Sequence, residues 1–286
     1  MSNKWIAVKV LAAPFYLEQL AGAIFALGAQ GVQEEENRFV IFFAEGDWNP
    51  DVYLNLYKWL SDIVPDFDES RLLVETQQEE NWLEKWKQNF KPFKIGRDIV
   101  IVPDWIDYRA GQNELVLKIT PGMAFGTGHH ETTQLCLLAL QKYFRPGMRL
   151  LDAGTGSGIL SIWAAKTGGS KILAIDNDPV AIDNAKENAR LNGVQNKVRF
   201  MVQDVAGLPE GQFDFIVANI NRNVLLEIAP GLTRALAKDG FLLLSGILKT
   251  DKNMVEKAYL KTGLKLTDQT ALKEWQALIF KKEQVR

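Results

Sequence analysis

The sequence predicts a mixed α/β protein with two domains, on three observations. Its 286 residues exceed the roughly 100 to 200 residues of a typical domain. The first 76 residues read in the order strand, helix, strand, strand, helix, strand. From residue 149 onward, apolar strands alternate with amphipathic helices, which is the pattern of a parallel sheet with helices on both faces.

The first domain, residues 1–76, is predicted to be ferredoxin-like. Its elements are expected at residues 4–10 (strand), 14–28 (helix), 31–35 and 38–43 (strands), 50–63 (helix) and 71–75 (strand). This order is the split β-α-β pattern. Because that fold hosts many unrelated functions, it indicates no more than a module for interaction or recognition.

Residues 77–94 are predicted to form a helical linker between the domains. Their composition shifts to charged residues, and Trp82 and Trp86 lie four residues apart, which places them on one face of a short helix. The two indoles either clamp this helix onto a core or contact a substrate. The second domain then covers residues 95–286.

The second domain is predicted to hold a Rossmann-like sheet. Strands are expected at about 99–102, 114–119, 149–154, 171–178, 198–204, 213–219, 240–245 and 275–281, and helices at 158–168, 179–193, 223–237 and 252–262. The strand at 275–281 counts as the seventh of the main sheet. Because no further crossover helix leads into it, we expect it to be antiparallel.

Composition excludes several kinds of protein. The 33 Lys+Arg against 35 Asp+Glu give a net charge of -2, so no global basic field favours direct nucleic-acid binding. One cysteine, Cys136, excludes an intramolecular disulfide, and with two histidines it is a thin supply for a Cys/His zinc site. No metal is predicted, although a carboxylate site stays open. Without a leader or a membrane-spanning run, we expect a cytoplasmic protein, and a monomer.

A glycine-rich stretch, DAGTGSG at residues 152–158, lies where a strand ends and a helix begins. Glycines let the backbone turn sharply and approach a ligand closely. Gly154 and Gly156 match the first two positions of a dinucleotide motif, but the third position is Ile159. The displaced glycine, and the acid before the first one, point away from a pyrophosphate and towards S-adenosylmethionine. A tight turn without a ligand is the alternative.

Two acidic residues follow at strand ends. Asp176 comes 22 residues after Gly154, close to the roughly 20-residue spacing at which an acid meets ribose hydroxyls. Asp178 competes for this role, but it is also suited to cap the helix that begins at Pro179. Asp204 closes the next strand, where it is expected either to accept from the adenine amine or to serve as a turn residue.

Asn219 ends another predicted strand, at the carboxyl edge where open α/β sheets bind ligands. Its amide can accept a hydrogen from an incoming amine and so aim the nitrogen lone pair, without acting as a rival nucleophile. The alternative role, capping the next helix, suits Asn221 or Asn223 better.

Residues 120–133 form a second glycine-rich segment, just before the expected cofactor domain. Phe125 is predicted to belong to a loop that closes on the ligand, and Thr132 and Thr133 either cap the next helix or bond the cofactor. For His129 and His130, a structural or loop-anchoring role is favoured over metal binding or general-base catalysis.

At these residues the sequence resembles the ribosomal protein L11 methyltransferases of bacteria. These are class I S-adenosylmethionine enzymes that methylate lysine and α-amino nitrogens of that ribosomal protein. The resemblance covers nearly the whole chain, and its specific parts are WLEKWKQNFKPFKIGRDIVIVPDW, PGMAFGTGHHETT, the block from LLDAGTGSG to ARLNGV, and VANINRNVLLEIAP. The chain departs from many relatives at His130-Glu131 and at Asn221-Arg222.

The resemblance implies a class I methyltransferase sheet of seven strands and S-adenosylmethionine as cofactor. It implies that the first domain recognises the ribosomal protein and that the linker lets this domain swing. Cofactor contacts are implied for Thr133, Gly154, Asp176 and Asn219. To these the residue patterns add Gly156, Phe125 and Asp204, and Asn219 is also expected to align the acceptor nitrogen.

Other functions stay open on the residues alone. They are methylation of RNA or a small amine, a non-enzymatic binding module, and a nicotinamide-dependent reductase. The near-neutral charge weighs against RNA, and the retained glycines and acid weigh against a decayed site. Ile159 in the third glycine position weighs against the reductase.

Overall fold

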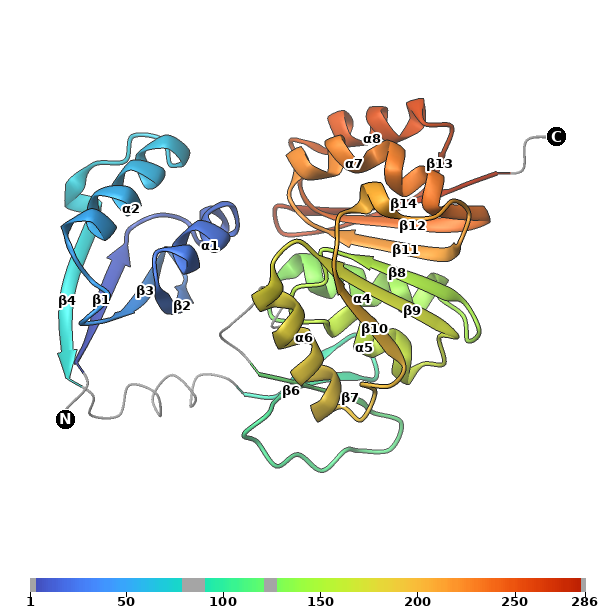
Figure 1. Cartoon of the computed structure of the whole chain (residues 1–286), viewed down its shortest axis with the longest axis horizontal. Coiled ribbons are helices and arrows are strands. Elements are labelled where there is room, and N and C mark those ends of the chain that lie inside the picture. Colours follow the sequence, from blue (N-terminus) through green and yellow to red (C-terminus); the bar gives the residue numbers. More distant parts are fainter. Residues whose placement is uncertain (1–3, 79–90, 121–127, 284–286) are drawn as a thin grey trace. The chain divides into compact units, whose positions relative to one another are not determined.

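The computed structural model describes residues 4–78, 91–120 and 128–283. The chain divides into two compact units, residues 1–90 and 91–286 (Figure 1). Each unit is described by itself below. Trp82, Trp86 and Phe125 lie outside the described residues.

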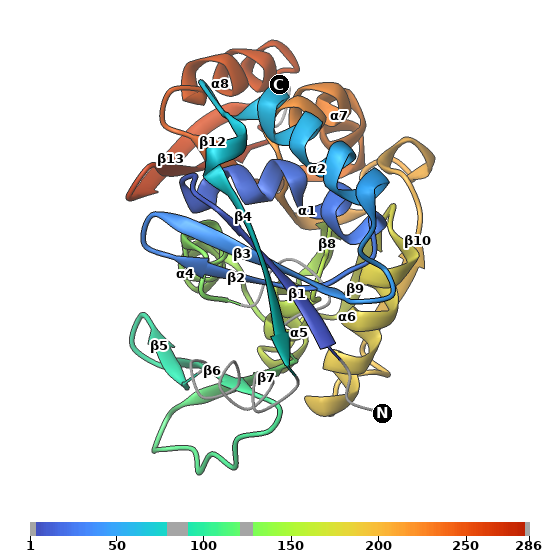
Figure 2. The same ribbon diagram turned by 90° about the vertical axis from the view of Figure 1, so that its left-hand side faces the viewer.

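The first unit is an antiparallel sheet of strand order β2-β3-β1-β4. Its elements are β1 (Lys4–Val10), a 3-10 turn (Pro14–Tyr16), α1 (Leu17–Ala26), β2 (Ala29–Glu35), β3 (Arg38–Ala44), α2 (Pro50–Ile63), a second 3-10 turn (Glu69–Arg71) and β4 (Leu72–Gln78). Both helices lie on the same face of the sheet (Figure 2). The β-α-β-β-α-β order is the one expected from the sequence.

Capping hydrogen bonds and prolines determine where the helices of this unit begin. The Asn49 side chain accepts hydrogen bonds from the main-chain N of Asp51 and of Val52, and Pro50 occupies the first turn of α2. The helix expected from Pro14 starts instead as a 3-10 turn and becomes α-helical at Leu17. The core between helices and sheet is fully buried and consists mainly of Val8, Leu20, Ile24, Phe39, Phe43, Leu56 and Leu60.

The second unit contains a seven-stranded sheet of order β10-β9-β8-β11-β12-β14-β13. The strands are β8 (Arg149–Ala153), β9 (Lys171–Asp176), β10 (Val198–Val202), β11 (Phe213–Asn219), β12 (Leu236–Leu248), β13 (Lys265–Leu272) and β14 (Trp275–Lys281). The strands from β8 to β12 are parallel, and β14 runs antiparallel to both of its neighbours, as expected. Strand β13 was not predicted, because this edge strand is mostly polar and exposed and carries little apolar signal.

Helices cover both faces of this sheet. They are α4 (Glu131–Tyr143), α5 (Ile159–Lys166), α6 (Pro179–Leu191), α7 (Arg222–Ala235) and α8 (Lys252–Lys261). Helices α7 and α8 lie on one face, and α4, α5 and α6 on the other (Figure 1). The core under α7 and α8 is closed by fully buried Tyr259, whose hydroxyl donates to the carbonyl of Leu225 at 2.7 Å.

A smaller sheet of order β5-β6-β7 precedes α4. It is formed by β5 (Phe93–Ile95), β6 (Ile99–Pro103) and β7 (Leu115–Ile119). Strand β5 begins inside the range predicted for the linker, and its three residues are too few to give a periodic signal. Strand β7 is tied to α6, because Asn188 Oδ1 accepts from the main-chain N of Thr120 at 2.9 Å.

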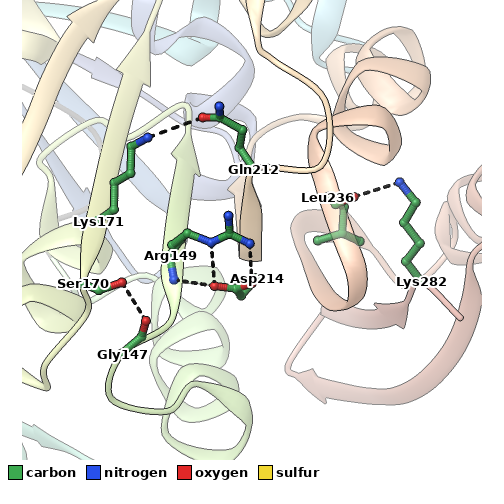
Figure 3. A network of polar contacts seen from close by, with 8 residues as sticks. All are labelled: Gly147, Arg149, Ser170, Lys171, Gln212, Asp214, Leu236 and Lys282. Carbon is green, nitrogen blue, oxygen red and sulfur yellow. Dashed lines mark hydrogen bonds and ion pairs between the residues drawn. The ribbon is translucent and has the colours of Figure 1, made fainter. Parts of the chain in front are cut away.

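The amino ends of the parallel strands are joined by polar contacts (Figure 3). Asp214 accepts from Nε and Nη2 of Arg149 at 2.9 and 2.7 Å, and from the main-chain N of Arg149 at 2.9 Å. Lys282 Nζ donates to the carbonyl of Leu236 at 2.8 Å. These contacts join strands β8 and β11 and anchor the residue that follows β14.

Within the described ranges, no helix is long and apolar enough to span a membrane. Over the same residues, no group of three or more His, Cys, Asp or Glu side chains is placed to hold a metal ion.

Candidate active site

Four of the predicted site residues lie at the carboxyl edge of the large sheet: Thr133, Gly154, Asp176 and Asn219. Gly154 follows β8, Asp176 ends β9 and Asn219 ends β11. The register aligns these ends, since Ala153 pairs with Ile175 and with Ala218. Thr133 in α4 lies at the same edge. Ser245 of β12, which is opposite Asn219, donates through Oγ to the carbonyl of the preceding residue, Thr132, at 3.4 Å.

The glycine loop after β8 adopts a conformation that favours glycine at three positions. Gly154, Gly156 and Gly158 have φ of 72°, 52° and 79°. A Cβ on Gly154 would lie 2.3 Å from Cγ2 of Ile220, and one on Gly158 would lie 3.0 Å from Cβ of Ala185 in α6. The third glycine therefore stands at 158 because α5 begins there against α6, which is the physical reason for the G-x-G-x-G spacing.

Asp176 organises the loop. Its Oδ2 accepts from the main-chain N of Gly156 at 3.0 Å, and its Oδ1 accepts from the main-chain N of Asp178 at 3.1 Å. Asp178 itself caps α6, since its Oδ1 accepts from the main-chain N of Val180 at 2.8 Å. The helix-capping alternative for Asp178 is thus confirmed, which leaves Asp176 as the carboxylate at the strand end.

Asp152, the acid before the first glycine, is a site residue to which the sequence analysis gave no role of its own. It is 1% exposed, and its Oδ2 accepts from Oγ1 of Thr155 at 2.7 Å and from N and Oγ of Ser161 at 3.2 and 2.8 Å. Burial raises its pKa to about 6. Its Oδ1 has no hydrogen-bond partner among the described residues. The available signal was a charged residue at the end of an otherwise apolar strand.

Asn219 and Thr133 each place a buried polar atom at this edge without a partner. Among the residues described, neither Asn219 Oδ1 nor Thr133 Oγ1 has a hydrogen-bond partner. Such an atom costs about 1–3 kcal/mol, so a set of them at one edge indicates a partner supplied by a ligand. The neighbouring Asn221 is satisfied, because its Oδ1 accepts from the main-chain N of Val224 at 3.1 Å and caps α7. The capping alternative therefore belongs to Asn221, as expected.

The start of α4 differs from one expectation. Thr132 and Thr133 were expected as possible caps, but the N-cap is His130, whose Nδ1 lies 3.2 Å from the main-chain N and 2.8 Å from Oγ1 of Thr132. Imidazole can accept as a hydroxyl does, so a His N-cap escapes rules based on short polar residues. The neighbouring His129 packs its ring against Phe93 at 3.9 Å between centroids, and burial lowers its pKa. Both contacts fit the structural role that was favoured.

Glu131 fastens α4 to the turn between β13 and β14. Its Oε1 lies 2.5 Å from Nζ of Lys273. Burial alone would raise the pKa of Glu131, but the hydrogen bond from Lys273 holds that pKa below its usual value. The start of α4 is therefore tied to the same edge of the sheet.

Two other residues singled out from the sequence have structural partners. The exposed Asp204 accepts from the main-chain N of Ala206 at 2.9 Å and caps a 3-10 turn (Val205–Gly207), which is the turn role weighed for it. Arg222 donates through Nη1 to Oδ1 of Asp251 at 2.9 Å and through Nε to Asn223 at 3.1 Å. The guanidinium is thereby held at the start of α8.

Comparison with known proteins assigns the family. The family model described as ribosomal protein L11 methyltransferase (PrmA) matches residues 4–283. Proteins named ribosomal protein L11 methyltransferase from Caldicellulosiruptor bescii and Clostridium perfringens are 34% and 32% identical over 304 and 312 residues, covering 98% of this chain and 99% of each relative.

A solved structure agrees with this assignment. The ribosomal protein L11 methylase of Lactobacillus delbrueckii subsp. bulgaricus is 32% identical and superposes with a TM-score of 0.64, over 68% of this chain and 100% of that one. The family match spans both units and includes every described site residue. The chain belongs to the ribosomal protein L11 methyltransferase family.

Proposed function

We propose that this protein transfers methyl groups from S-adenosylmethionine to lysine side-chain and α-amino nitrogens of ribosomal protein L11. The observation that carries the proposal is the family match over residues 4–283. The match includes both units: the second, with the candidate site, and the first, which forms a separate domain. The relatives named after this activity are matched over 98% of the chain.

The residues present fit the cofactor. A carboxylate accepts from both hydroxyls of a ribose, which suits Asp176, and Gly154 and Gly156 have positive φ, which lets the loop turn tightly at the strand end. The hydroxyl of Thr133 is buried and lacks a partner within the described structure, as expected for a group that bonds a ligand. We assign the adenine amine to Asp204, in addition to the turn that its Oδ1 caps. Phe125, assigned to closing the site, stays a prediction.

The acceptor nitrogen must be neutral to react. When bound, S-adenosylmethionine supplies a methyl group on a cationic sulfur, already activated for in-line displacement. A free lysine has a pKa near 10.4, so about one in a thousand is neutral at pH 7. The site therefore has to favour the uncharged amine, which apolar burial does because it disfavours ammonium.

Asn219 is suited to align that amine. Its buried Oδ1 can accept one N–H of the acceptor and so direct the nitrogen lone pair. Because the amide carries no charge, it does not hold the amine in the ammonium form, as a carboxylate would. No general base is assigned, since the proton can leave to water between transfers.

We assign substrate recognition to residues 1–76, the linker to 77–94 and methyl transfer to 95–286. Charge supports this division. Residues 1–76 contain 5 Lys and Arg against 12 Asp and Glu, a net charge of -7, whereas the remaining 210 residues contain 28 against 23, a net charge of +5. A ribosomal protein that binds RNA presents Lys and Arg, so an acidic module favours its approach. We expect a monomer that acts in the cytoplasm, where ribosomal proteins are made, without binding nucleic acid itself.

Intact-mass analysis tests the proposal directly. Unmethylated ribosomal protein L11 is incubated with this protein and S-adenosylmethionine, with a cofactor-free reaction as control. We expect the mass of L11 to increase in whole methyl steps, whose number reports the transfers. If the mass stays constant while calorimetry shows cofactor binding, the acceptor is wrong and the transfer site stands.

A further inference from the structure

Trp275 carries a buried donor without a partner. It is the first residue of β14, it is 4% exposed, and its Nε1 has no hydrogen-bond partner among the described residues. The indole N–H can only donate. A buried donor left unpaired costs about 1–3 kcal/mol. Because Nε1 of Trp163 in α5 also lacks a partner among the described residues, the missing partner points to a ligand only where the residue also lies at the site edge.

Trp275 lies at the edge that carries the proposed site. Strand β14 is antiparallel to β12, with Trp275 opposite Leu248, and β12 is parallel to β11, with Ser245 opposite Asn219. The first residue of β14 therefore lies at the same edge as the last residue of β11. The indole also meets the ring of His130, the N-cap of α4, with centroids 5.0 Å apart and planes at 73°.

The strand order places Trp275 on the side away from the glycine loop. Along the edge, β9 and β8 carry Asp176 and Gly154, then β11 ends in Asn219, and β14 lies two strands further on. Neighbouring strands are about 4.8 Å apart, which puts β14 about 10 Å from β11 across the sheet. Trp275 also lies two to three residues further along the strands than Asn219, so about 12–14 Å separate the two main-chain positions. The nucleoside side of the site is thus remote from this indole.

A lysine side chain covers most of that separation, and the side chains of Asn219 and Trp275 can cover the remainder. At about 1.2 Å of extension per bond, the five bonds from Cα to Nζ span about 6 Å, and the main-chain carbonyl oxygen lies about 2 Å beyond. An amine aligned at Asn219 therefore has its own main chain close to β14. The oxygen acceptor that fits an N–H at this place is a main-chain carbonyl of the acceptor.

The indole is held in place from two sides. The turn Lys273-Glu274 connects β13 to β14, and Lys273 adopts φ of 50°, a strained conformation for a residue with a side chain. Nζ of Lys273 is paired with Glu131 in the first turn of α4, next to His130. A donor anchored in this way has little freedom to lose on binding, which favours a positioning role.

We propose that Trp275 is a positioning residue on the acceptor side, whose indole N–H donates to the main-chain carbonyl oxygen of the residue that bears the reacting amine. This inference rests on the proposed function. It names a peptide subsite that is separate from the cofactor contacts.

The first test removes the N–H and keeps an aromatic ring, in Trp275→Phe. Trp163→Phe is the matched control, because Trp163 in α5 is equally buried and its Nε1 also lacks a partner in the described structure. We expect Trp275→Phe to raise KM for L11 about 3- to 10-fold, with cofactor Kd and kcat nearly unchanged, as for one lost hydrogen bond. Trp163→Phe should change none of these.

The second test uses the wild-type protein, so it does not depend on a variant that folds. Indole N–H signals are recorded by NMR, and that of Trp275 is identified by its proximity to the His130 ring. We expect this signal to move when L11 is added to protein saturated with S-adenosylhomocysteine, and to stay in place with S-adenosylhomocysteine alone.

The outcomes separate the two proposals. If wild-type protein adds no methyl group to L11, the proposed function fails. If methylation proceeds but Trp275→Phe leaves KM for L11 unchanged and the indole signal does not respond to L11, the positioning role is wrong. A signal that moves with S-adenosylhomocysteine alone would assign the indole to the cofactor instead and overturn the inference.

Discussion

The two edges of the large sheet differ in how well their polar side chains are hydrogen-bonded. At the amino edge, Asp214 accepts three hydrogen bonds from Arg149, and Lys282 donates to a strand-end carbonyl (Figure 3). At the carboxyl edge, partners are lacking within the described structure for buried side-chain atoms of Thr133, Asp152, Asn219 and Trp275. Strands β8 and β11 thus carry paired side chains at the amino edge, Arg149 and Asp214, and unpaired polar atoms at the carboxyl edge, in Asp152 and Asn219.

This difference shows where the fold gives up stability for binding. An unpaired buried polar atom costs about 1–3 kcal/mol, whereas a partly exposed ion pair stabilises the fold by up to about 1 kcal/mol. Substitutions at the amino edge should therefore alter stability, and those at the carboxyl edge should alter ligand binding or transfer. Each experiment below tests that separation.

The largest effect is expected for Asp176→Ala. The change removes the proposed ribose contact and leaves two main-chain N–H groups, of Gly156 and Asp178, without their acceptor. Hydrogen bonds to charged groups contribute about 1.5–3 kcal/mol each, so cofactor Kd should rise on the order of 1000-fold. Isothermal titration with S-adenosylmethionine measures this change.

Asp178→Ala is the control for Asp176→Ala. Asp178 caps α6 and should cost about 1 kcal/mol of stability without a large change in cofactor Kd. Cofactor affinity equal to wild type in the Asp176 variant would contradict the assignment of the ribose contact.

Asn219→Ala should lower kcat about 100-fold, because a misaligned acceptor nitrogen misses the line of displacement. Thermal stability of the ligand-free protein should stay close to wild type, since the change also removes an unpaired buried acceptor. Steady-state kinetics with L11 and thermal unfolding measure the two effects.

The capping residue Asn221 supplies the contrast to Asn219. Asn221→Ala should cost about 1 kcal/mol of stability through its lost N-cap and retain most of kcat. If Asn219→Ala instead reduced stability and kept kcat, Asn219 would be a structural residue.

At the amino edge, Asp214→Ala should reduce stability by about 1 kcal/mol. The effect is small because the side chains of Arg149 and Asp214 are 39% and 34% exposed, and solvent screens their attraction. The unfolding temperature should fall by about 2–4 °C. Cofactor Kd and kcat should match wild type. A loss of activity larger than the loss of folded protein would break the proposed separation of the two edges.

The last predictions concern pH, and the two edges should respond with opposite sign. Burial raises the pKa of Asp152 to about 6, so its contribution to stability is present below its unfolded pKa near 3.9 and is lost as pH rises through about 6. The hydrogen bond from Arg149 lowers the pKa of Asp214, so its contribution is present above about pH 4 and is lost as pH falls through the lowered value.

Unfolding temperatures of wild type and of Asp152→Asn and Asp214→Asn, measured from pH 3 to 7, isolate each group. Relative to Asp152→Asn, wild type should lose stability between about pH 4 and 6. Relative to Asp214→Asn, wild type should lose stability only when the pH falls below about 4. If the unfolding temperatures of wild type and Asp152→Asn changed in parallel with pH, the pKa of Asp152 would not be raised.

The sequence predicted most elements because their signals are local. Helix α2 begins and ends as expected, since the Asn49 cap and Pro50 direct its start and its apolar stripe is regular. The polar edge strand β13 was missed, because its residues pack against β14 through the backbone more than through apolar side chains. Strand assignment at an edge depends on a partner that the local sequence does not contain.

The site could be predicted in part for the same reason. Glycines before a helix, and polar residues at the ends of apolar strands, placed Gly154, Asp176 and Asn219 on one edge, because parallel strands share their carboxyl ends. The sequence by itself thus determined the fold class, the family and the strand-end residues of the site.

Only the tertiary structure decided which polar atoms are left without a partner. Asp152, Thr133 and Trp275 come from β8, α4 and β14, and their burial depends on sheet register and on the turn that ties Lys273 to Glu131. The His130 cap, too, is defined by atoms in space rather than by residue type. Hydrogen-bond satisfaction depends on all neighbours within about 3 Å, most of which are far away in sequence, and no local pattern encodes it.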